Sequence, residues 1–161
     1  MRNSRKHLFL AIIFAVITGC SQYGDYLYAE RGCINCKIPE PMHEGKALVY
    51  VIRTPYFLNE FELHRIYLLQ GDEKKLIGKN QDRTYCPGYL DAGRAEVIIK
   101  WEDDNDIAAK LDIEVEAGKI YYIEHDVSGR IYSALIYPKL RLVSEAEGKA
   151  LLRSVIRKCE N

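Results

Sequence analysis

Apolar side chains recur at every second position in two neighbouring stretches of the sequence, 94–101 and 107–116, and charged side chains alternate with them. A period of two places alternate residues on opposite faces of a β-strand, so each stretch is predicted to be a half-buried strand. The acidic segment 103–106 is predicted to be the turn between them. The side chains expected to face the core are Ala95, Val97, Ile99, Trp101, Ile107, Ala109, Leu111, Ile113 and Val115.

Further strands are predicted on both sides of this pair. Residues 46–52 are apolar on both faces, which is typical of a central strand. Gly71-Asp72 suits a two-residue hairpin turn, and Pro87, which has no amide hydrogen, places its strand at an edge or bulge. Pro138 is expected to break the run before the last strand. The other predicted strands cover 61–69, 75–78, 83–90, 120–127, 131–137 and 140–143.

The C-terminal segment has the pattern of a helix. Ser144 and Glu147 form a capping box, in which each side chain accepts a hydrogen bond from the other residue's amide. Helical spacing then predicts one apolar stripe that docks on the sheet, made of Gly148, Leu151, Leu152, Val155, Ile156 and Cys159. Short strands followed by one helix predict an all-β fold, an antiparallel immunoglobulin-like β-sandwich with one C-terminal α-helix.

The N-terminus has the layout of an export signal. Three cations precede an apolar run over 8–17, which is about half the length of a membrane-spanning helix. Ile17-Thr18-Gly19-Cys20 then matches the bacterial lipobox, an aliphatic residue, two small residues and a cysteine. We therefore predict a lipoprotein signal peptide over 1–19, cleavage between Gly19 and Cys20, and an acylated Cys20, with palmitate among its lipids.

The residue after Cys20 indicates where the protein is sorted. Asp at that position is associated with retention in the inner membrane of Gram-negative bacteria, and this chain has Ser21. The predicted location is therefore the periplasmic face of the outer membrane. Residues 20–44 contain prolines and glycines without periodicity and are predicted to be a tether, and 45–161 to be the domain. Tyr23, Tyr26 and Tyr28 in the tether are expected to pack loosely on the domain.

The balance of charges restricts the possible partners. The chain has 23 basic and 23 acidic residues, and removal of 1–19 leaves a net charge of about −3. Such a chain lacks the basic excess of a nucleic-acid-binding protein. Membrane contact is therefore expected through the N-terminal lipid, and the expected further partner is an envelope protein of unknown identity.

Several segments of the sequence resemble a family of bacterial lipoproteins, the domain of unknown function 2846 family. The similar segments are Gly45-Lys46-Ala47-Leu48-Val49-Tyr50-Val51-Ile52-Arg53, Leu69-Gln70-Gly71-Asp72 through Ile77-Gly78, Thr84-Tyr85 with Ala92-Gly93, Glu116-Ala117-Gly118-Lys119-Ile120-Tyr121-Tyr122, and 140–147. They follow the order found in the family and span about residues 45–159. Ala92 replaces the family's proline, and Cys86-Pro87-Gly88 and the Cys33, Cys36 pair are not family features. The resemblance implies a small sandwich on a lipid anchor, without established activity or catalytic residues.

Four cysteines remain when Cys20 carries lipid: Cys33, Cys36, Cys86 and Cys159. An oxidising compartment favours disulfides, and four cysteines allow three pairings. We predict two disulfides and prefer two long bridges from Cys33 and Cys36 to Cys86 and Cys159. The main alternative pairs Cys33 with Cys36 and Cys86 with Cys159. The Cys-x-x-Cys spacing also leaves open a thiol-disulfide redox function, and four thiols leave open a zinc site.

The remaining polar motifs give weaker indications. His64 and His125 lie on predicted strands, where a single histidine is usually structural, and His43 lies in the tether. The acidic segment 102–106 lacks the glycine and the distant glutamate of a calcium-binding loop. The sequence therefore predicts a non-enzymatic structural or partner-binding module without cofactor or metal. The alternatives are a redox protein using Cys33 and Cys36 and a metal-binding or cofactor-binding lipoprotein.

Overall fold

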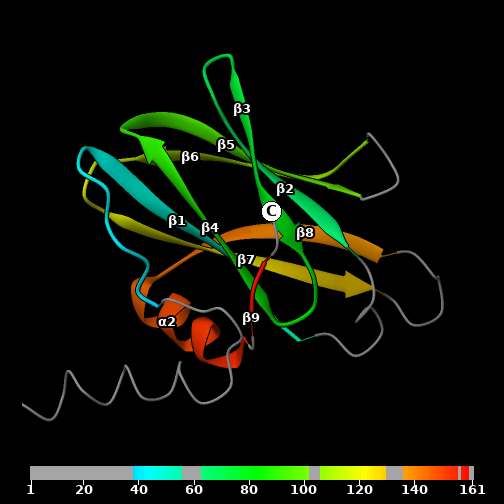
Figure 1. Ribbon diagram of the computed structural model, residues 1–161. Coiled ribbons are helices and arrows are strands. Elements are labelled where there is room, and N and C mark those ends of the chain that lie inside the picture. The colour runs from blue at the N-terminus through cyan, green and yellow to red at the C-terminus, as the bar shows by residue number, and fades with distance from the viewer. Residues whose placement is uncertain (1–37, 56–62, 102–105, 130–135, 156, 160–161) are drawn as a thin grey trace, which may run out of the picture.

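The computed structural model describes residues 38–55, 63–101, 106–129, 136–155 and 157–159, which form two facing β-sheets with one helix outside them (Figure 1). The five-stranded sheet has the order β8-β7-β1-β4-β9, and the four-stranded sheet has the order β3-β2-β5-β6. The predicted all-β, two-sheet architecture with one helix is confirmed. The elements are β1 Lys46–Arg53, β2 His64–Gln70, β3 Glu73–Asn80, β4 Thr84–Asp91, β5 Gly93–Trp101, β6 Ile107–Val115, β7 Ile120–Gly129, β8 Ile136–Val143, α2 Glu145–Ser154 and β9 Arg157–Lys158.

Strand β1 lies in the middle of the five-stranded sheet and is buried on both faces, as its sequence predicts. Ala47, Val49 and Val51 enter the core between the sheets, whereas the alternate residues belong to a second apolar cluster on the outer face. The alternating strands β5 and β6 contribute to the inner core through Ala95, Val97, Ile99, Ile113 and Val115. The inward prediction is wrong at Ile107, which is 55% exposed at the start of β6, next to a register shift in the β5–β6 pair.

Two strand pairs are parallel, so the expectation of a purely antiparallel sandwich is wrong. Strand β1 pairs with β7 in parallel, from Leu48 opposite Ile120 to Arg53 opposite His125, and β4 pairs with β9 in parallel. Hairpins make neighbours antiparallel, but β1 and β7 are not connected by a hairpin. A strand buried on both faces is the usual environment for parallel pairing. The hairpin predicted at Gly71-Asp72, between β2 and β3, is antiparallel and confirmed.

Both prolines within strands lie at sheet edges. The carbonyl of Tyr85 in β4 accepts a hydrogen bond from the Cys159 amide at 2.9 Å, on the side of β4 where β9 lies. Pro87 follows two residues later, so its backbone nitrogen and carbonyl face this same side. The β4–β9 pairing covers only Thr84 and Tyr85, which leaves Pro87 at an edge, as predicted. Pro138 does not end a strand as predicted, because β8 continues through it at the outer edge of its sheet.

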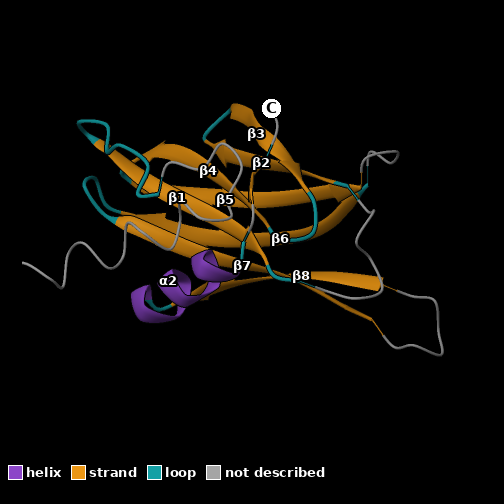
Figure 2. Cartoon of the chain, turned by 60° about the horizontal axis from the view of Figure 1, so that its bottom comes forward, coloured by secondary structure: helices purple, strands orange, loops and turns teal. Residues whose placement is uncertain are grey.

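Helix α2 covers the outer face of the five-stranded sheet (Figure 2). Its predicted N-terminal cap is present, since the Glu147 amide donates a hydrogen bond to Ser144 Oγ at 3.3 Å. The helix ends at Ser154, and Val155 already has extended backbone angles. The prediction that the helical stripe continues to Cys159 is therefore wrong: the chain turns into β9, and Cys159 reaches the core from the end of that strand.

Candidate functional site

A disulfide fixes the C-terminal end of the described chain. Cys86 in β4 is bonded to Cys159, with Cα atoms 5.2 Å apart, and both side chains belong to the inner core. This pair belongs to the alternative pairing, so the preferred prediction of two long bridges to Cys86 and Cys159 is wrong. The sequence analysis kept this pair only as the alternative and placed Cys159 on the helix, whereas β9 brings it alongside β4. Cys33 and Cys36 lie outside the described residues, as do Gly19 and Cys20.

A small basic hollow lies beside this disulfide. It has a volume of about 130 Å³ and lies where β9 meets the start of β4 and the end of β3. We call it the basic hollow, and the described residues that line it are Leu63, Lys79, Gln81, Thr84, Arg157, Lys158 and Cys159. These residues contribute three cations and no carboxylate. The sequence offered no indication of this site, because its members come from three distant stretches, at residue 63, over 79–84 and over 157–159.

Hydrogen bonds within the basic hollow hold its polar groups in place. Thr84 Oγ1 donates to the carbonyl of Gln81 at 2.8 Å and accepts from the Gln81 amide at 3.0 Å. The Gln81 side-chain oxygen in turn accepts a hydrogen bond from Arg157 Nη2. Thr84 is 1% exposed and lies opposite Arg157 in the β4–β9 pair. The guanidinium is therefore positioned by a rigid part of the fold.

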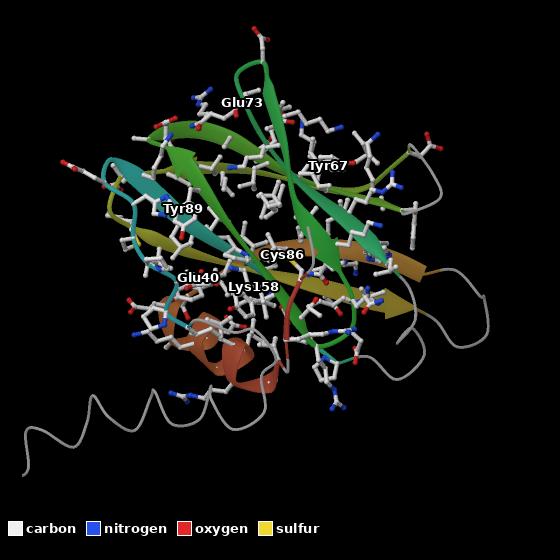
Figure 3. All side chains as sticks on the ribbon, in the orientation of Figure 1. Glu40, Tyr67, Glu73, Cys86, Tyr89 and Lys158 are labelled. Atoms are coloured by element: carbon white, nitrogen blue, oxygen red, sulfur yellow. A yellow bond between two sulfur atoms is a disulfide. The ribbon has the colours of Figure 1, made fainter. Side chains whose placement is uncertain are left out.

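Residues 38–45, here called the N-terminal strap, lie on the outer face of the five-stranded sheet next to β9. The carboxylate of Glu40 is 6% exposed and contacts Lys158 Nζ at 2.8 Å, and it accepts a hydrogen bond from the Tyr85 hydroxyl at 3.1 Å (Figure 3). The Glu40 amide donates to the Tyr50 hydroxyl at 2.8 Å. A buried carboxylate needs such partners, so the Glu40 side chain fixes the strap to β4 and β9, and the Glu40 amide fixes it to β1.

Burial and a neighbouring carboxylate act together on the tyrosines beneath the strap. Desolvation raises the pKa of Tyr50 well above its ordinary value; the hydrogen bond from the Glu40 amide opposes this increase, and the charge of the Glu40 carboxylate adds to it. The ring of Tyr50 stacks on Tyr122, with centroids 5.6 Å apart. Tyr89 closes the strap on the other side, where its hydroxyl donates to the Pro41 carbonyl at 2.8 Å and its ring stacks on His43 at 3.9 Å. These tyrosines are neutral hydrogen-bonding groups at physiological pH.

The two histidines that the sequence placed on strands meet between the sheets. His64 in β2 and His125 in β7 are both 0% exposed, and His64 Nδ1 lies 3.1 Å from His125 Nε2. We call them the histidine pair. Arg53 and Asn80 are also completely buried at this end of the core, with Arg53 Nη1 donating to the Asn80 carbonyl at 3.2 Å. No spacing rule connects residues so far apart in sequence, and so the pair was not predicted.

The surroundings of the histidine pair favour neutral rings. Desolvation lowers the pKa of His64 from 6.5 to about 3, with a further decrease from the Arg53 charge. Burial also lowers the pKa of His125 well below its ordinary value, and the positive charges of His64 and Arg53 act in the same direction. One neutral ring therefore donates the hydrogen bond and the other accepts it. The histidine pair is enclosed by protein, and its hydrogen bond links β2 in the four-stranded sheet to β7 in the five-stranded sheet.

The structure describes only part of the predicted N-terminal segment and of the acidic cluster. Residues 1–37 and the acidic cluster over 102–105 lie outside the described residues, whereas residues 38–44 of the predicted tether pack on the domain as the strap. Among the described residues, no three His, Cys, Asp or Glu side chains are arranged to hold a metal ion. In that same part of the chain, no helix combines the length and hydrophobicity needed to cross a bilayer.

A scan against protein-family models finds no match, and a search of curated proteins also finds none.

Proposed function

We propose that the chain is a lipid-anchored lipoprotein of the Gram-negative outer membrane, exposed to the periplasm, whose β domain is a non-enzymatic structural or partner-binding module. The observation that carries the proposal is the Ile17-Thr18-Gly19-Cys20 sequence directly after a basic segment and a short apolar run. Acyl chains on Cys20 would supply the membrane affinity that an acidic mature chain lacks.

The packing of the N-terminal strap supports this proposal. A tether that begins at Cys20 would enter the domain through residues 38–45, and Glu40 binds these residues to β1, β4 and β9. The anchor would therefore be connected to a fixed point on the five-stranded sheet. The non-enzymatic part rests on how the reactive side chains are used: the histidine pair is enclosed, and Cys86 and Cys159 are bonded to each other.

Labelling with a radioactive or alkyne-tagged fatty acid in cells tests the anchor. Cys20→Ala should abolish labelling and release the protein from the membrane fraction. Cys33→Ala is the matched control, since it removes a cysteine from the same segment and should leave labelling intact. Persistent tight membrane association of the Cys20→Ala protein would contradict the proposal.

Sorting and partners need separate tests. Ser21→Asp should move the protein from the outer-membrane to the inner-membrane fraction in a density gradient, and an unchanged distribution would contradict the proposed location. Cross-linking in intact cells should capture the envelope partner, and the same complex should form again from purified components. Failure of the captured protein to bind the purified chain would argue against a partner-binding role.

Two finer assignments are part of the proposal. We assign the chain to the domain of unknown function 2846 family on the segments that resemble it between residues 45 and 159. We also propose an immunoglobulin-like topology, supported by two facing sheets and a buried core between them. An experimental structure of a family member, compared strand by strand with this chain and with immunoglobulin domains, tests both assignments.

A further inference from the structure

The Cys86–Cys159 disulfide and the Glu40 carboxylate bridge β4 and β9 at neighbouring positions (Figure 3). Glu40 accepts a hydrogen bond from the Tyr85 hydroxyl at 3.1 Å and contacts Lys158 Nζ at 2.8 Å. Tyr85 directly precedes Cys86, and Lys158 directly precedes Cys159. The covalent bridge and the ionic bridge therefore span the same gap between the two strands, one residue apart.

The position of β9 depends on few contacts. The strand has two residues and pairs with β4 over these two alone. The Cys159 amide donates to the Tyr85 carbonyl at 2.9 Å, and Arg157 donates to the side chain of Gln81. Segments with so few backbone bonds open locally at low cost, whereas a disulfide keeps its two ends together. Reduction of the disulfide should therefore free β9 and, with it, Lys158.

The N-terminal strap depends in turn on Lys158. The Glu40 residue is 6% exposed, and a buried carboxylate that loses its cation is left with an uncompensated charge. The Tyr85 hydroxyl is a neutral donor and does not balance that charge. Glu40 regains its hydration only by leaving the sheet, and residues 38–45 leave with it. Departure of β9 should therefore release the strap.

We propose that the Cys86–Cys159 disulfide is a redox latch: its oxidised form holds the strap on the sheet, and reduction by a dithiol releases β9 and the strap together. The attacked sulfur is that of Cys159, because Cys159 lines the basic hollow whereas Cys86 is 0% exposed. The latch does not depend on the proposed lipid anchor. If the anchor is present, release lengthens the tether by residues 38–45, which span about 26 Å when fully extended.

The reduction is a thiol–disulfide exchange in two steps. A thiolate of the dithiol attacks Cys159 Sγ, the bond to Cys86 breaks, and the Cys86 sulfur takes up a proton while a mixed disulfide forms. The second thiol of the dithiol loses its proton and attacks the mixed disulfide, and the Cys159 sulfur leaves and is protonated. Two electrons and two protons have then passed to the cysteine pair, and the dithiol has become a disulfide.

Amide hydrogen exchange, followed by NMR at pH 7 in the oxidised and the dithiothreitol-reduced chain, tests the release. The full chain carries three substitutions that leave the latch pair as its only cysteines, Cys20→Ala, Cys33→Ala and Cys36→Ala. The Glu40 amide donates to the Tyr50 hydroxyl when the strap is bound. We expect reduction to speed exchange of this amide at least about tenfold, within the usual range of coupling between sites, while amides of β5 and β6 stay protected. Equal exchange rates in the two forms would overturn the proposal.

Coupling is reciprocal, so the strap should also affect the disulfide. In mixtures of reduced and oxidised dithiothreitol, Glu40→Gln should make the latch pair at least about tenfold easier to reduce, which corresponds to about 30 mV. Glu44→Gln, at an exposed position in the same strap, is the matched control and should leave this equilibrium unchanged. The same equilibrium for Glu40→Gln and the parent chain would also overturn the proposal.

A further variant applies if the reduced chain unfolds as a whole, with β5 and β6 losing protection too. Lys158→Ala keeps the disulfide and removes the cation that holds Glu40. In the oxidised form it should speed exchange of the Glu40 amide at least about tenfold, since the carboxylate loses the same partner as on reduction. An unchanged rate for this amide in Lys158→Ala would contradict the latch, whatever the reduced chain does.

Discussion

The contact between helix α2 and strand β7 predicts an unusual response to substitution at Gly148. Gly148 is buried one turn after the N-terminal cap of α2, where it faces Tyr122. A Cβ atom built on Gly148 would lie 2.5 Å from Tyr122 Cδ1 and closer still to its Cγ and Cβ. Carbon atoms in contact are normally about 3.5–4.0 Å apart. Gly148→Ala therefore requires a shift of about 1 Å or more between helix and strand.

Two opposing terms determine the change in stability. Alanine is the better helix former, by about 1 kcal/mol in an exposed helix interior. Overpacking in a close-packed core costs about 1–3 kcal/mol, and it is not easily relieved here because the overlap includes Tyr122 Cβ, which cannot swing away from its own backbone. A displaced helix also loses the contacts of Leu152, which is 7% exposed. We expect Gly148→Ala to lower the free energy of unfolding by about 1–2 kcal/mol.

Urea unfolding, followed by circular dichroism and by the fluorescence of Trp101, measures this free energy at pH 7 under oxidising conditions. The control is Ala150→Gly on the exposed side of the same helix, where propensity alone should reduce stability by about 1 kcal/mol. Glycine would then be the more stabilising residue at position 148 of α2, and alanine the more stabilising residue at position 150. A Gly148→Ala protein as stable as the native chain, or more stable, would refute the close approach of α2 to Tyr122.

Three further predictions concern the histidine pair, the disulfide and the strap. His64 and His125 stay neutral in the folded state because their pKa values are lowered from 6.5, so below that pH the unfolded chain binds more protons than the folded chain does. The free energy of unfolding should therefore fall by about 2–4 kcal/mol between pH 7 and pH 5. Urea unfolding at a series of pH values measures it, and a free energy that does not change with pH would contradict the prediction. Cys159→Ala should lower the unfolding free energy by about 2–4 kcal/mol, because the disulfide spans 73 residues, and equal stability of oxidised and reduced native protein would argue against it. Glu40→Gln should lower the free energy of unfolding by about 1–3 kcal/mol, a moderate value because the partner Lys158 is 33% exposed and can be hydrated. The control Glu44→Gln, at an exposed position, should change this free energy little in the same thermal or urea unfolding. Equal effects of the two substitutions would refute the role given to the buried carboxylate.

The sequence by itself determined the features that depend on local periodicity and local chemistry. The alternation around 95–115, the two-sided burial of β1, the turn at Gly71-Asp72 and the cap at Ser144 all follow from residues within one element. Each depends on contacts over a few residues, and so spacing and turn preferences are sufficient to predict it. Pro87 belongs here too, because the missing amide hydrogen alone restricts it to an edge.

Tertiary structure decided which distant segments meet. The parallel pairing of β1 with β7, the contact of His64 with His125 and the ion pair of Glu40 with Lys158 join residues that no sequence pattern relates. The end of α2 shows the same limit: its apolar spacing continues to Cys159, but pairing of β9 with β4 and the bond to Cys86 draw the chain out of the helix. Long-range pairing depends on the summed packing of the whole core, whereas a local pattern specifies only which face of each element is apolar.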